Sequence, residues 1–495
     1  MDLQKRSDML TKAKKALSDK SAVANLHKEG KMSSYELMRA LFDDGTFVET
    51  NAFVKAYANE IGSSEPAEYE GVVCGYGAID GRLVFAYSQD VSRANGAFSK
   101  AAADKIASLY DLALKNGAPV VSMFDSLGAK VLDGVDVLAG YGSVMKKSAG
   151  IKGKIPEISV VLGNVCGATA IIASMADVMV VCEGAVFSQN PVNVLTQEGA
   201  DKSFGSAKYT FEHGYASDYA STPKEALLSV RSILSYLPSN RFDKNVYAGC
   251  EDDANRTTPE IATVVAKQDY DVHNVISAIA DANSFKELTA GKSLGIVTAF
   301  AFINGIPCGI VANNPSVKEG KLCAGCLRKA KNFVKLCDSF GIAVLNLVGA
   351  AGFDERCEAN GGRVTEIAAE LAKAYAVASV PIVTVNIGEC YGTAFTLMGS
   401  KALGADLVFA LDSAKISVLK PSSSVAMMWN EKLSGSKAPI EKRKSLEEEW
   451  ALYMSTPLLA ANAGQIDDII SADMFRARVA SALEMLSMKS EFVKL

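Results

Sequence analysis

GVVCGYGAIDGRLVFAYSQD, residues 71–90, decides the fold, because GIVTAFAFINGIPCGIVANN at 295–314 repeats its pattern. Both stretches alternate apolar residues with small or polar ones around a two-residue turn, Asp80-Gly81 in the first and Asn304-Gly305 in the second. Such pairs favour a type I′ hairpin, in which both central residues need a positive φ. The two turn glycines stand 224 positions apart, so we expect one structural unit to occur twice.

The repeat extends beyond the hairpin with a nearly constant offset: Gly167 and Gly392 are 225 positions apart. Patterns of apolar residues predict helix 101–115, strand 119–124, strand 158–162, helix 168–175 and strand 178–181 in the first unit, and 327–340, 343–348, 382–386, 394–402 and 407–410 in the second. Alternating strands and helices indicate parallel β-α units covered on both faces. We expect an N-terminal domain at 1–240, a linker at 241–267 and a C-terminal domain at 268–495.

Bulk properties exclude several classes of protein. A length of 495 residues suits two domains, and a net charge of −5 argues against nucleic-acid binding. The basic run 5–20 is interspersed with acidic residues and is typical of a solvated amphipathic helix. No stretch reaches the roughly 18 apolar residues of a membrane span, and no secretory signal is apparent. The ten cysteines lie mostly in apolar runs and indicate reduced thiols, so we expect a cytoplasmic protein.

Two glycine turns occupy equivalent positions in the repeat, Gly163–Thr169 and Gly388–Ala394. Each follows an expected strand and precedes an expected helix, which leaves backbone N–H groups unpaired at a helix N-terminus. Such N–H groups can bind an oxyanion, including the enolate of a thioester. The alternative is tight strand–helix packing that only small residues permit, and spacing alone leaves both interpretations open.

A third loop, 125–134, follows another expected strand and contains Ser126, Gly128, Ala129 and Lys130. Its position before a helix could hold a carbonyl or phosphate group, with Lys130 supplying a positive charge. The alternative is an ordinary β-α turn with a solvated lysine, which the spacing alone favours.

Other chemistries lack their residues. There is no Gly-x-Ser-x-Gly elbow, no phosphate-binding Gly-x4-Gly-Lys loop, and the three histidines, His27, His213 and His273, form no nucleophile pattern. Cys323-Ala-Gly-Cys326 is a lone CxxC without the second pair that structural zinc requires, so we interpret it as clustered core thiols and expect no metal.

Several collinear stretches resemble the carboxyltransferase subunits of biotin-dependent acyl-CoA carboxylases and decarboxylases, a group that includes propionyl-CoA carboxylase beta and methylmalonyl-CoA decarboxylase alpha subunits. They are the hairpin at 71–90, LALKNGAPVVSMFDS at 112–126, the turn at 163–170, SYLPSN at 235–240, GIVANNP at 309–315 and YGTAFTLMGSKALGAD at 391–406. The resemblance runs from about residue 30 to about residue 490. It implies an α/β fold of two tandem crotonase-like domains of ββα-superhelix type.

The resemblance also implies a reaction and its sites. A carboxyl group would move between biotin on a separate carrier protein and the α-carbon of a short-chain acyl-CoA. The N-terminal domain would take the acyl-CoA, with Gly167 and Ala168 as oxyanion donors, and Ser126, Gly128, Ala129 and Lys130 near the coenzyme A. The C-terminal domain would take the biotin, with Gly392, Thr393 and Ala394 at the second turn and Thr396 at a position that helps to select the acyl chain.

The implied partners are a biotin carboxyl carrier protein, a biotin carboxylase or membrane decarboxylase subunit, and further copies of this chain in a dimer or trimer of dimers. The chain contains no Ala-Met-Lys-Met biotinylation site, in keeping with a separate carrier. Departures from the family pattern include Gly388-Glu389, where the family has Arg-Lys, and Ala350-Ala351-Gly352-Phe353, where it has Val-Pro-Gly-Phe. They leave two alternatives open: a non-catalytic scaffold in a mixed oligomer, and a crotonase-type hydratase or isomerase without biotin.

Overall fold

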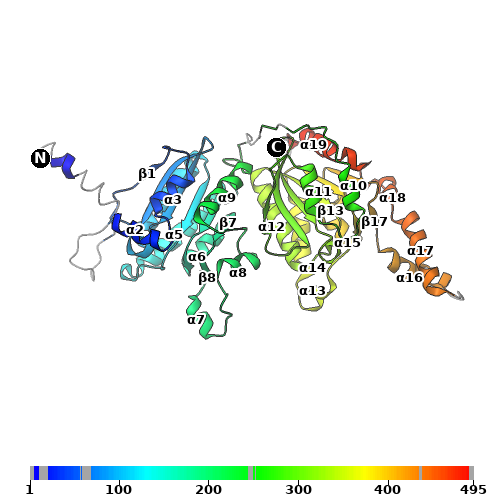
Figure 1. Ribbon diagram of the computed structural model, residues 1–495, viewed down its shortest axis with the longest axis horizontal. Helices are drawn as coiled ribbons and strands as arrows, with labels where there is room; N and C mark the ends of the chain where they lie inside the picture. Colours follow the sequence, from blue (N-terminus) through cyan, green and yellow to red (C-terminus); the bar gives the residue numbers. More distant parts are fainter. Residues whose placement is uncertain are drawn as a thin grey trace. The chain divides into compact units, whose positions relative to one another are not determined.

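The computed structural model describes residues 5–9, 20–55, 57, 69–243, 249–250, 252–433 and 438–489. Most of the basic run 5–20 and the last residues of the chain lie outside these ranges. Contacts between residues divide the chain into two compact units, Met1–Asp243 and Lys244–Leu495. Each unit is built around its own seven-stranded sheet (Figure 1).

The two sheets have the same strand order and the same directions. The first runs β1 (Val48–Thr50), β2 (Val72–Ile79), β3 (Arg82–Gln89), β4 (Val120–Phe124), β5 (Glu157–Val161), β7 (Val178–Cys182), β9 (Asp218–Ala220). The second runs β10 (Lys286–Leu288), β11 (Ile296–Ile303), β12 (Ile306–Asn313), β13 (Ala343–Val348), β14 (Ile382–Asn386), β16 (Leu407–Leu411), β18 (Asp468–Ile470). The first three strands of each sheet pair antiparallel and the remaining pairs are parallel, so each sheet is mixed and only its later strands are wholly parallel as expected.

The predicted hairpin turns are confirmed in both units. The φ angles of Asp80 and Gly81 are 50° and 75°, and those of Asn304 and Gly305 are 53° and 73°. An aspartate caps each turn: the carboxylate of Asp43 accepts from the N–H groups of Asp80 (3.2 Å) and Gly81 (3.0 Å). The side chain of Asp281 does the same at 2.9 and 2.8 Å in the second unit. The repeat therefore preserves individual contacts as well as topology.

Helices cover both faces of each sheet. In the first unit α4 (Lys100–Asn116) and α5 (Asp136–Ile151) pack together on one face of the sheet (Figure 1). The helices α3 (Ser34–Leu41) and α9 (Pro223–Tyr236) form a second pair, and both contact strands of the same sheet. In the second unit α12 (Ala324–Phe340) and α14 (Val364–Val377) pack together, while α11 (Val272–Ile279) contacts α19 (Phe475–Met485). The expected helix 394–402 is shorter than predicted: α15 spans Gly392–Leu397. The α-helix cannot continue through Gly399, whose φ is 73°. This residue lies so close to Asn346 that an added Cβ would be 2.3 Å from its side-chain nitrogen.

Within the expected linker 241–267, the described residues include a helix, α10 (Glu260–Val265), that packs on α11. Ile261 is fully buried in the core of the second unit, and the Thr258 hydroxyl donates to the carbonyl of Ala472 at 2.6 Å. This part of the segment is folded onto the second unit because it supplies apolar side chains to that core. None of the helices in the described ranges has the length and apolar character needed to span a bilayer.

Two small parallel sheets, which the sequence did not reveal, present the glycine turns. β6 (Asn164–Cys166) pairs with β8 (Val186–Ser188), and β15 (Glu389–Tyr391) pairs with β17 (Lys415–Ser417). In each unit the short strand leads from the carboxyl end of a main strand to the glycine that begins the next helix. The small sheets therefore fix where each helix N-terminus lies.

Candidate active sites

In the first unit the glycine turn begins helix α6 (Ala168–Met175). Gly167 has a φ of 63°, which a side chain would make unfavourable. Its own N–H donates to the carbonyl of Gln189 at 3.0 Å, so this predicted donor is engaged within the protein. The next N–H belongs to Ala168, the first residue of the helix, and the described residues offer it no acceptor. A backbone site at this turn therefore has Ala168, rather than Gly167, as its donor.

The second unit has a similar glycine turn at α15, in which the engaged N–H belongs to the residue before the glycine. Gly392 has a φ of 61°, and the preceding N–H, that of Tyr391, donates to the carbonyl of Ala350 at 3.2 Å. Among the described residues we find no acceptor for the N–H groups of Gly392, Thr393 or Ala394. Ala394 is buried, whereas Thr393 and Thr396 are exposed. Only backbone groups are thus common to the two turns.

The predicted loop at 125–130 supplies a second outward N–H in the first unit. Phe98 forms a parallel bridge with Ala129: its N–H donates to Gly128 O, and its carbonyl accepts from Lys130 N, both at 2.8 Å. The N–H of Ala129 consequently faces away from Phe98, toward the open side of the loop. The Ser126 hydroxyl is buried and accepts from the N–H of Gly128 at 3.0 Å, so Ser126 shapes the loop.

The side chain of Lys130 lies near Asp133, with its Nζ 3.8 Å from Oδ1 of that residue. The charge of Lys130 is therefore partly satisfied at the start of the following helix. The backbone of the loop, rather than the lysine side chain, makes the contacts that define its shape.

The second unit has the same bridge, which the sequence did not single out. Leu322 N donates to Gly352 O at 2.9 Å, and Asp354 N donates to Leu322 O at 3.0 Å. The N–H of Phe353 therefore faces outward like that of Ala129, which precedes it by 224 positions. The constant offset was the signal that could have located this residue.

Strained turns brace both loops. Ala94, Asn95 and Gly96 all have positive φ, as do Lys318, Glu319 and Gly320 at the equivalent positions. Left-handed conformations of this kind cost about 1–3 kcal/mol for each non-glycine residue and persist only where the surrounding structure enforces them. Here the carbonyl of Asn95 accepts from Leu127 N at 3.2 Å, and that of Glu319 accepts from Ala351 N at 3.4 Å. These two hydrogen bonds connect the strained turns to the backbone of the two donor loops.

Asp125 ties the two donor elements of the first unit together. Its carboxylate accepts from Lys31 Nζ at 2.8 Å and from the N–H of Asn164 at 3.1 Å. The carbonyl of Asn164 in turn accepts from Ser126 N at 2.8 Å. Gly163 makes room for this carboxylate, because a Cβ there would lie 2.1 Å from Asp125 Oδ1. The loop after β4 and the turn before α6 are therefore connected through one aspartate.

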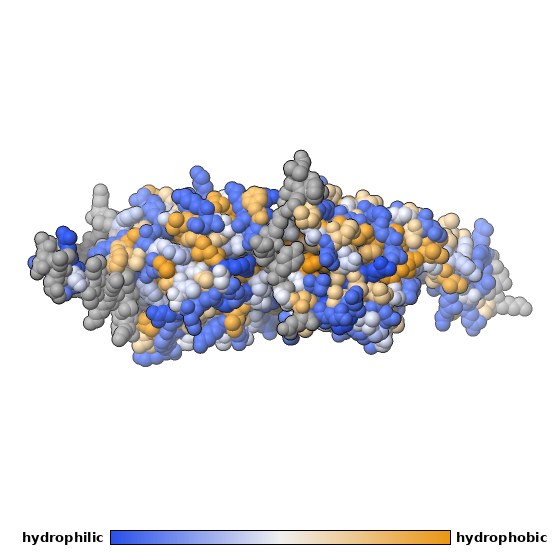
Figure 2. Space-filling model, turned by 90° about the horizontal axis from the view of Figure 1, so that it is seen from above, coloured by the Kyte–Doolittle hydropathy of each residue, from blue (hydrophilic) through white to orange (hydrophobic). Residues whose placement is uncertain are grey.

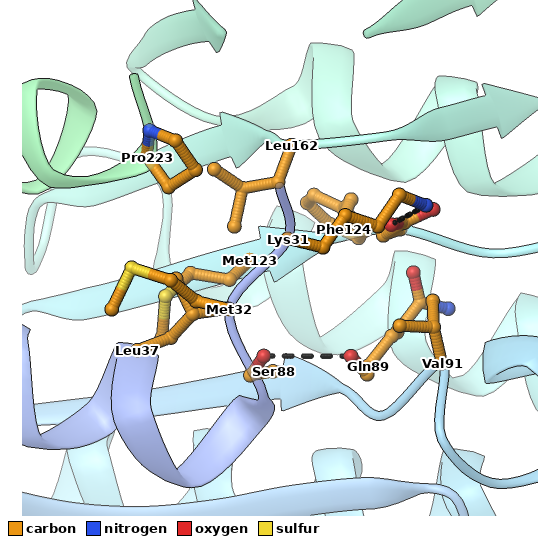
Figure 3. A pocket seen from close by; sticks show the side chains of 11 residues that line it. Lys31, Met32, Leu37, Ser88, Gln89, Val91, Met123, Phe124, Leu162 and Pro223 are labelled. Carbon is orange, nitrogen blue, oxygen red and sulfur yellow. Dashed lines mark hydrogen bonds and ion pairs between the residues drawn. The ribbon is translucent and has the colours of Figure 1, made fainter. Parts of the chain in front are cut away.

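Two cavities share Lys31, Val91 and Asp125. The inner one, of about 20 Å³, is lined largely by apolar side chains, including those of Met32, Met123 and Leu162 (Figure 3). Its volume suits one water molecule. The outer one, of about 270 Å³, is lined by Asn25, Leu26, Glu29, Ser92, Asn95, Leu127 and Asn164 as well. The outer cavity adjoins the donor loop and has the size and polarity for part of a polar ligand.

The second unit has a cavity of about 400 Å³ at the carboxyl ends of β13, β14 and β16. Its lining includes Tyr270, Gly349, Gly388, Glu389 and Lys415. Burial raises the pKa of Tyr270, and the described residues give its hydroxyl no hydrogen-bond partner. A Cβ on Gly388 would lie 2.8 Å from that hydroxyl, which explains why a larger residue is absent there. A buried hydroxyl without a partner, at the edge of a cavity, is suited to a polar ligand group.

None of the three histidines lies in either glycine turn. The histidines contact other groups: His27 lies beside Glu36, His213 against the carbonyl of Tyr209, and His273 between Asp271 and Glu287. Hydrogen bonds to Glu287 and Asp271 raise the pKa of His273 to about 9. In the described ranges no cluster of three or more His, Cys, Asp or Glu side chains has a geometry for metal. The chemistry available at the turns is backbone hydrogen bonding to a developing negative charge.

Comparison with known proteins assigns the chain to a family. The model of the carboxyl transferase domain matches residues 25–495. Methylmalonyl-CoA decarboxylase subunit alpha of Propionigenium modestum is 34% identical over 475 residues, covering 94% of this chain and 92% of the relative. The putative propionyl-CoA carboxylase beta chain of Bacillus subtilis is 34% identical over 480 residues, covering 95% and 93%.

Among solved structures, transcarboxylase 12S in its hexamer assembly, with methylmalonyl-coenzyme A and methylmalonic acid bound, matches with a TM-score of 0.93 and 30% identity. The match covers 99% of this chain and 96% of that one. These findings confirm the resemblance, the two-domain fold and the carboxyltransferase class expected from the sequence. The chain belongs to the carboxyl transferase domain family.

Proposed function

We propose that this protein transfers a carboxyl group between biotin on a carrier protein and the α-carbon of a short-chain acyl-CoA. The observation that carries this proposal is the duplicated backbone device. Each unit has a helix-start N–H without a protein acceptor and an outward N–H in the adjoining loop, Ala168 with Ala129 and Thr393 with Phe353. Carboxyl transfer develops negative charge on two oxygens, one on the thioester and one on the biotin ureido group, so a pair of such sites matches the reaction.

The first unit is assigned to the acyl-CoA. The N–H groups of Ala168 and Ala129 would hold the thioester oxygen as the α-carbon gains or loses its carboxyl group and the oxygen becomes enolate-like. Each such donor contributes about 10²–10³ in rate when it points at the developing charge. Asp125 keeps the two donor elements together, and the outer cavity beside Leu127 and Asn164 offers space for part of the coenzyme. No side-chain nucleophile is needed for this step.

The second unit is assigned to biotin, and its residues fit that group. A ureido ring carries a carbonyl acceptor, and the unpartnered hydroxyl of Tyr270 can donate to it at the 400 Å³ cavity. When bound, carboxybiotin supplies the carboxyl group that is transferred. The N–H groups of Thr393 and Phe353 would stabilise negative charge on the ureido oxygen. Glu389 replaces a cation of the family pattern. Its Oε1 lies 3.4 Å from Nζ of Lys415, so the lysine partly neutralises its charge.

The partners follow from the reaction and from the surface. A biotin carboxyl carrier protein must deliver the biotin, and a biotin carboxylase or membrane decarboxylase subunit must load or unload it. The expectation of a cytoplasmic protein rests on the cysteine pattern of the sequence, in which most of the ten cysteines lie in apolar runs. Assays with different acyl-CoA thioesters test whether Thr396 helps to select the acyl chain.

Further copies of this chain form the other partner. Exposed apolar side chains follow the donor loop, with Leu127 65%, Val131 83%, Val135 78% and Leu138 65% accessible. Apolar residues so exposed mark protein–protein contacts. Figure 2 shows hydrophobic residues among hydrophilic ones on one face of the molecule. A homo-oligomer that covers residues 127–138 would bury these side chains beside Ala129 and exclude water from the first site.

The first test is carboxyl loss from malonyl-CoA, methylmalonyl-CoA and glutaconyl-CoA, each incubated with the purified protein and free biotin. Biotin-dependent loss from one of them is the expected result, and it identifies the acyl group at the same time. A folded oligomer that is inactive with all three, also with a biotinylated carrier protein, would contradict the proposal and favour the scaffold. Carboxyl loss without biotin would contradict biotin-dependent transfer, whereas hydration or isomerisation of an enoyl-CoA would favour the crotonase-type hydratase or isomerase.

A further inference from the structure

Two cysteines lie in contact at the start of α12, within the β12–α12–β13 unit. Cys323 is the N-cap residue and Cys326 lies in the first turn of this 17-residue helix. Their Sγ atoms are 3.1 Å apart, and the N–H of Cys326 donates to the Sγ of Cys323 at 3.3 Å. Gly325 lies between them and must be small, since a Cβ there would be 2.3 Å from the hydroxyl of Ser293. The CxxC is thus held with both sulfurs facing each other.

The two thiols differ in accessibility and acidity. Cys323 is partly exposed, whereas only 2% of Cys326 is accessible. The contact with the Cys326 thiol and hydrogen bonds from the N–H groups of Cys326 and Gly325 lower the pKa of Cys323 below that of an ordinary thiol. The same contact and burial raise the pKa of Cys326. An accessible thiolate beside a buried thiol is the arrangement of an attacking and a resolving cysteine.

The first unit shows that the fold itself does not require these sulfurs. The residues 224 positions earlier are Ser99 and Ala102, and the Ser99 hydroxyl caps α4 by accepting from Ala102 N at 2.9 Å. A hydroxyl cap and a buried methyl group therefore satisfy the same positions. The two thiols of the second unit provide a reactivity beyond the needs of helix capping.

We propose that Cys323 and Cys326 form a redox-active dithiol that closes reversibly to a disulfide. With a low-molecular-weight disulfide as oxidant, the Cys323 thiolate attacks one sulfur and releases a thiolate, leaving a mixed disulfide. Cys326 then attacks the Cys323 sulfur, its proton passes to solvent, and the second thiolate leaves. Two protein thiols are oxidised and one disulfide is reduced to two thiols. This chemistry is independent of carboxyl transfer, so its test needs no acyl-CoA.

Closure also acts on the second donor loop. The Cys323 sulfur would exchange its role as N-cap acceptor for a covalent bond, loosening the first turn of α12. Leu322, the preceding residue, is bridged to Gly352 and Asp354, which flank Phe353. Oxidation is therefore expected to increase mobility at 352–354, whereas the equivalent loop at 128–130, bridged to Phe98, has no dithiol beside it.

The test is peptide mapping of the full-length protein after equilibration with mixtures of reduced and oxidised glutathione. The expected product is an intramolecular Cys323–Cys326 disulfide that reduced glutathione reverses. Alkylation of Cys323 in the reduced protein should follow a pH profile with a midpoint well below the roughly 8.5 of an ordinary thiol. The matched control is the variant Cys323→Ser with Cys326→Ala, which reproduces the Ser99 and Ala102 pair and should retain the cap without oxidation.

Amide hydrogen exchange completes the test. Oxidised protein should exchange several-fold faster than reduced protein at 324–327 and 352–354, with 128–130 unchanged, and the double variant should not respond to oxidant. The proposal is overturned if Cys323 instead pairs with Cys357, whose sulfur accepts from Ala324 N at 3.4 Å. It is also overturned if Cys323 stops at the mixed disulfide. A disulfide that leaves exchange at 352–354 unchanged would overturn the coupling to the donor loop.

Discussion

The Nζ of Lys31 lies 2.8 Å from Oδ2 of Asp125, an ion pair between residues 94 positions apart in the sequence. The lysine comes from the segment before α3, and the aspartate directly follows β4. Because Asp125 also binds the N–H of Asn164, this pair connects the N-terminal segment to both donor elements of the first site.

The Lys31–Asp125 pair should therefore be coupled in stability and in activity. Lys31→Met and Asp125→Asn should each reduce the rate of carboxyl transfer. The double variant should lose less free energy of unfolding than the two single variants lose together. A coupling energy of about 0.5 kcal/mol or more is expected for contacting residues in one network, measured by urea unfolding of the four proteins.

The control for this cycle is the more exposed pair of Lys147 and Asp111, at 2.6 Å. Lys147→Met should change the free energy of unfolding by less than about 0.5 kcal/mol, as is usual for surface ion pairs, and leave activity intact. Strict additivity of Lys31→Met and Asp125→Asn would show that the contact does not hold the loop.

Gly163→Ala should damage the first site by steric displacement of Asp125. The added Cβ would lie 2.1 Å from Oδ1 of that residue, so the carboxylate must leave Asn164. We expect a rate loss of at least about tenfold, because small misplacements of positioning groups are costly. Gly142→Ala, in α5 with no atom within 4 Å of the new Cβ, is the control and should be neutral or slightly stabilising. Placing Gly163→Ala in an Asp125→Ala background should cause no further loss.

Glu157 should make the first unit less stable as the pH rises from about 4.5 to about 7. This residue is buried, accepts hydrogen bonds from Tyr110 and Ser148, and burial raises its pKa to about 7 from 4.5. Between these two values the folded state keeps a proton that the unfolded state releases. The contribution of Glu157 to the free energy of unfolding is therefore fully present below about pH 4.5. It falls by roughly 1.4 kcal/mol per pH unit until the pH passes the pKa of the folded state.

The measurement is thermal unfolding from pH 5 to pH 8 for the parent protein and for Glu157→Gln. The parent should lose more stability than the variant over this range. The second unit has Ile382 at the equivalent position, so its unfolding transition should not depend on Glu157. Parallel pH profiles for parent and variant would refute the raised pKa.

The oligomer should depend on the apolar segment beside the donor loop. Val131→Asp with Val135→Asp should lower the molar mass measured by light scattering, because both side chains are largely exposed in the single chain. Leu228→Asp, on α9 and 63% exposed, is the control and should leave the mass unchanged. An unchanged oligomer in the Val131 and Val135 variant would place the contact elsewhere.

The sequence predicted features that are specified locally. Asp-Gly and Asn-Gly turns, apolar strands and glycine-started helices follow from neighbouring residues and period, and the constant offset showed the duplication. The resemblance then supplied the family. Gly167 and Gly392 were identified as glycine turns between an expected strand and an expected helix, and both have the positive φ that favours glycine.

The remaining features depend on tertiary contacts that leave no local pattern. Lys31 meets Asp125 only after the sheet has formed, and the left-handed turns at Ala94 and Lys318 use residues that ordinarily avoid that conformation. The bond from Gly167 N–H to Gln189 O comes from the small β6–β8 sheet, whose strands are three residues long. Spacing alone therefore placed the turns correctly but could not identify which N–H remains available.

The most direct measurement of the central claim is the rate of biotin-dependent carboxyl loss from acyl-CoA in Ala168→Pro and Thr393→Pro. Proline is tolerated in the first turn of a helix and lacks the N–H, so both proteins should stay folded. Ala168→Ser and Thr393→Ala keep the N–H and are the controls. We expect losses of about 10²–10³-fold in each proline variant and little change in the controls. Near-parental rates in folded proline variants would contradict the assignment of these backbone groups to the reaction.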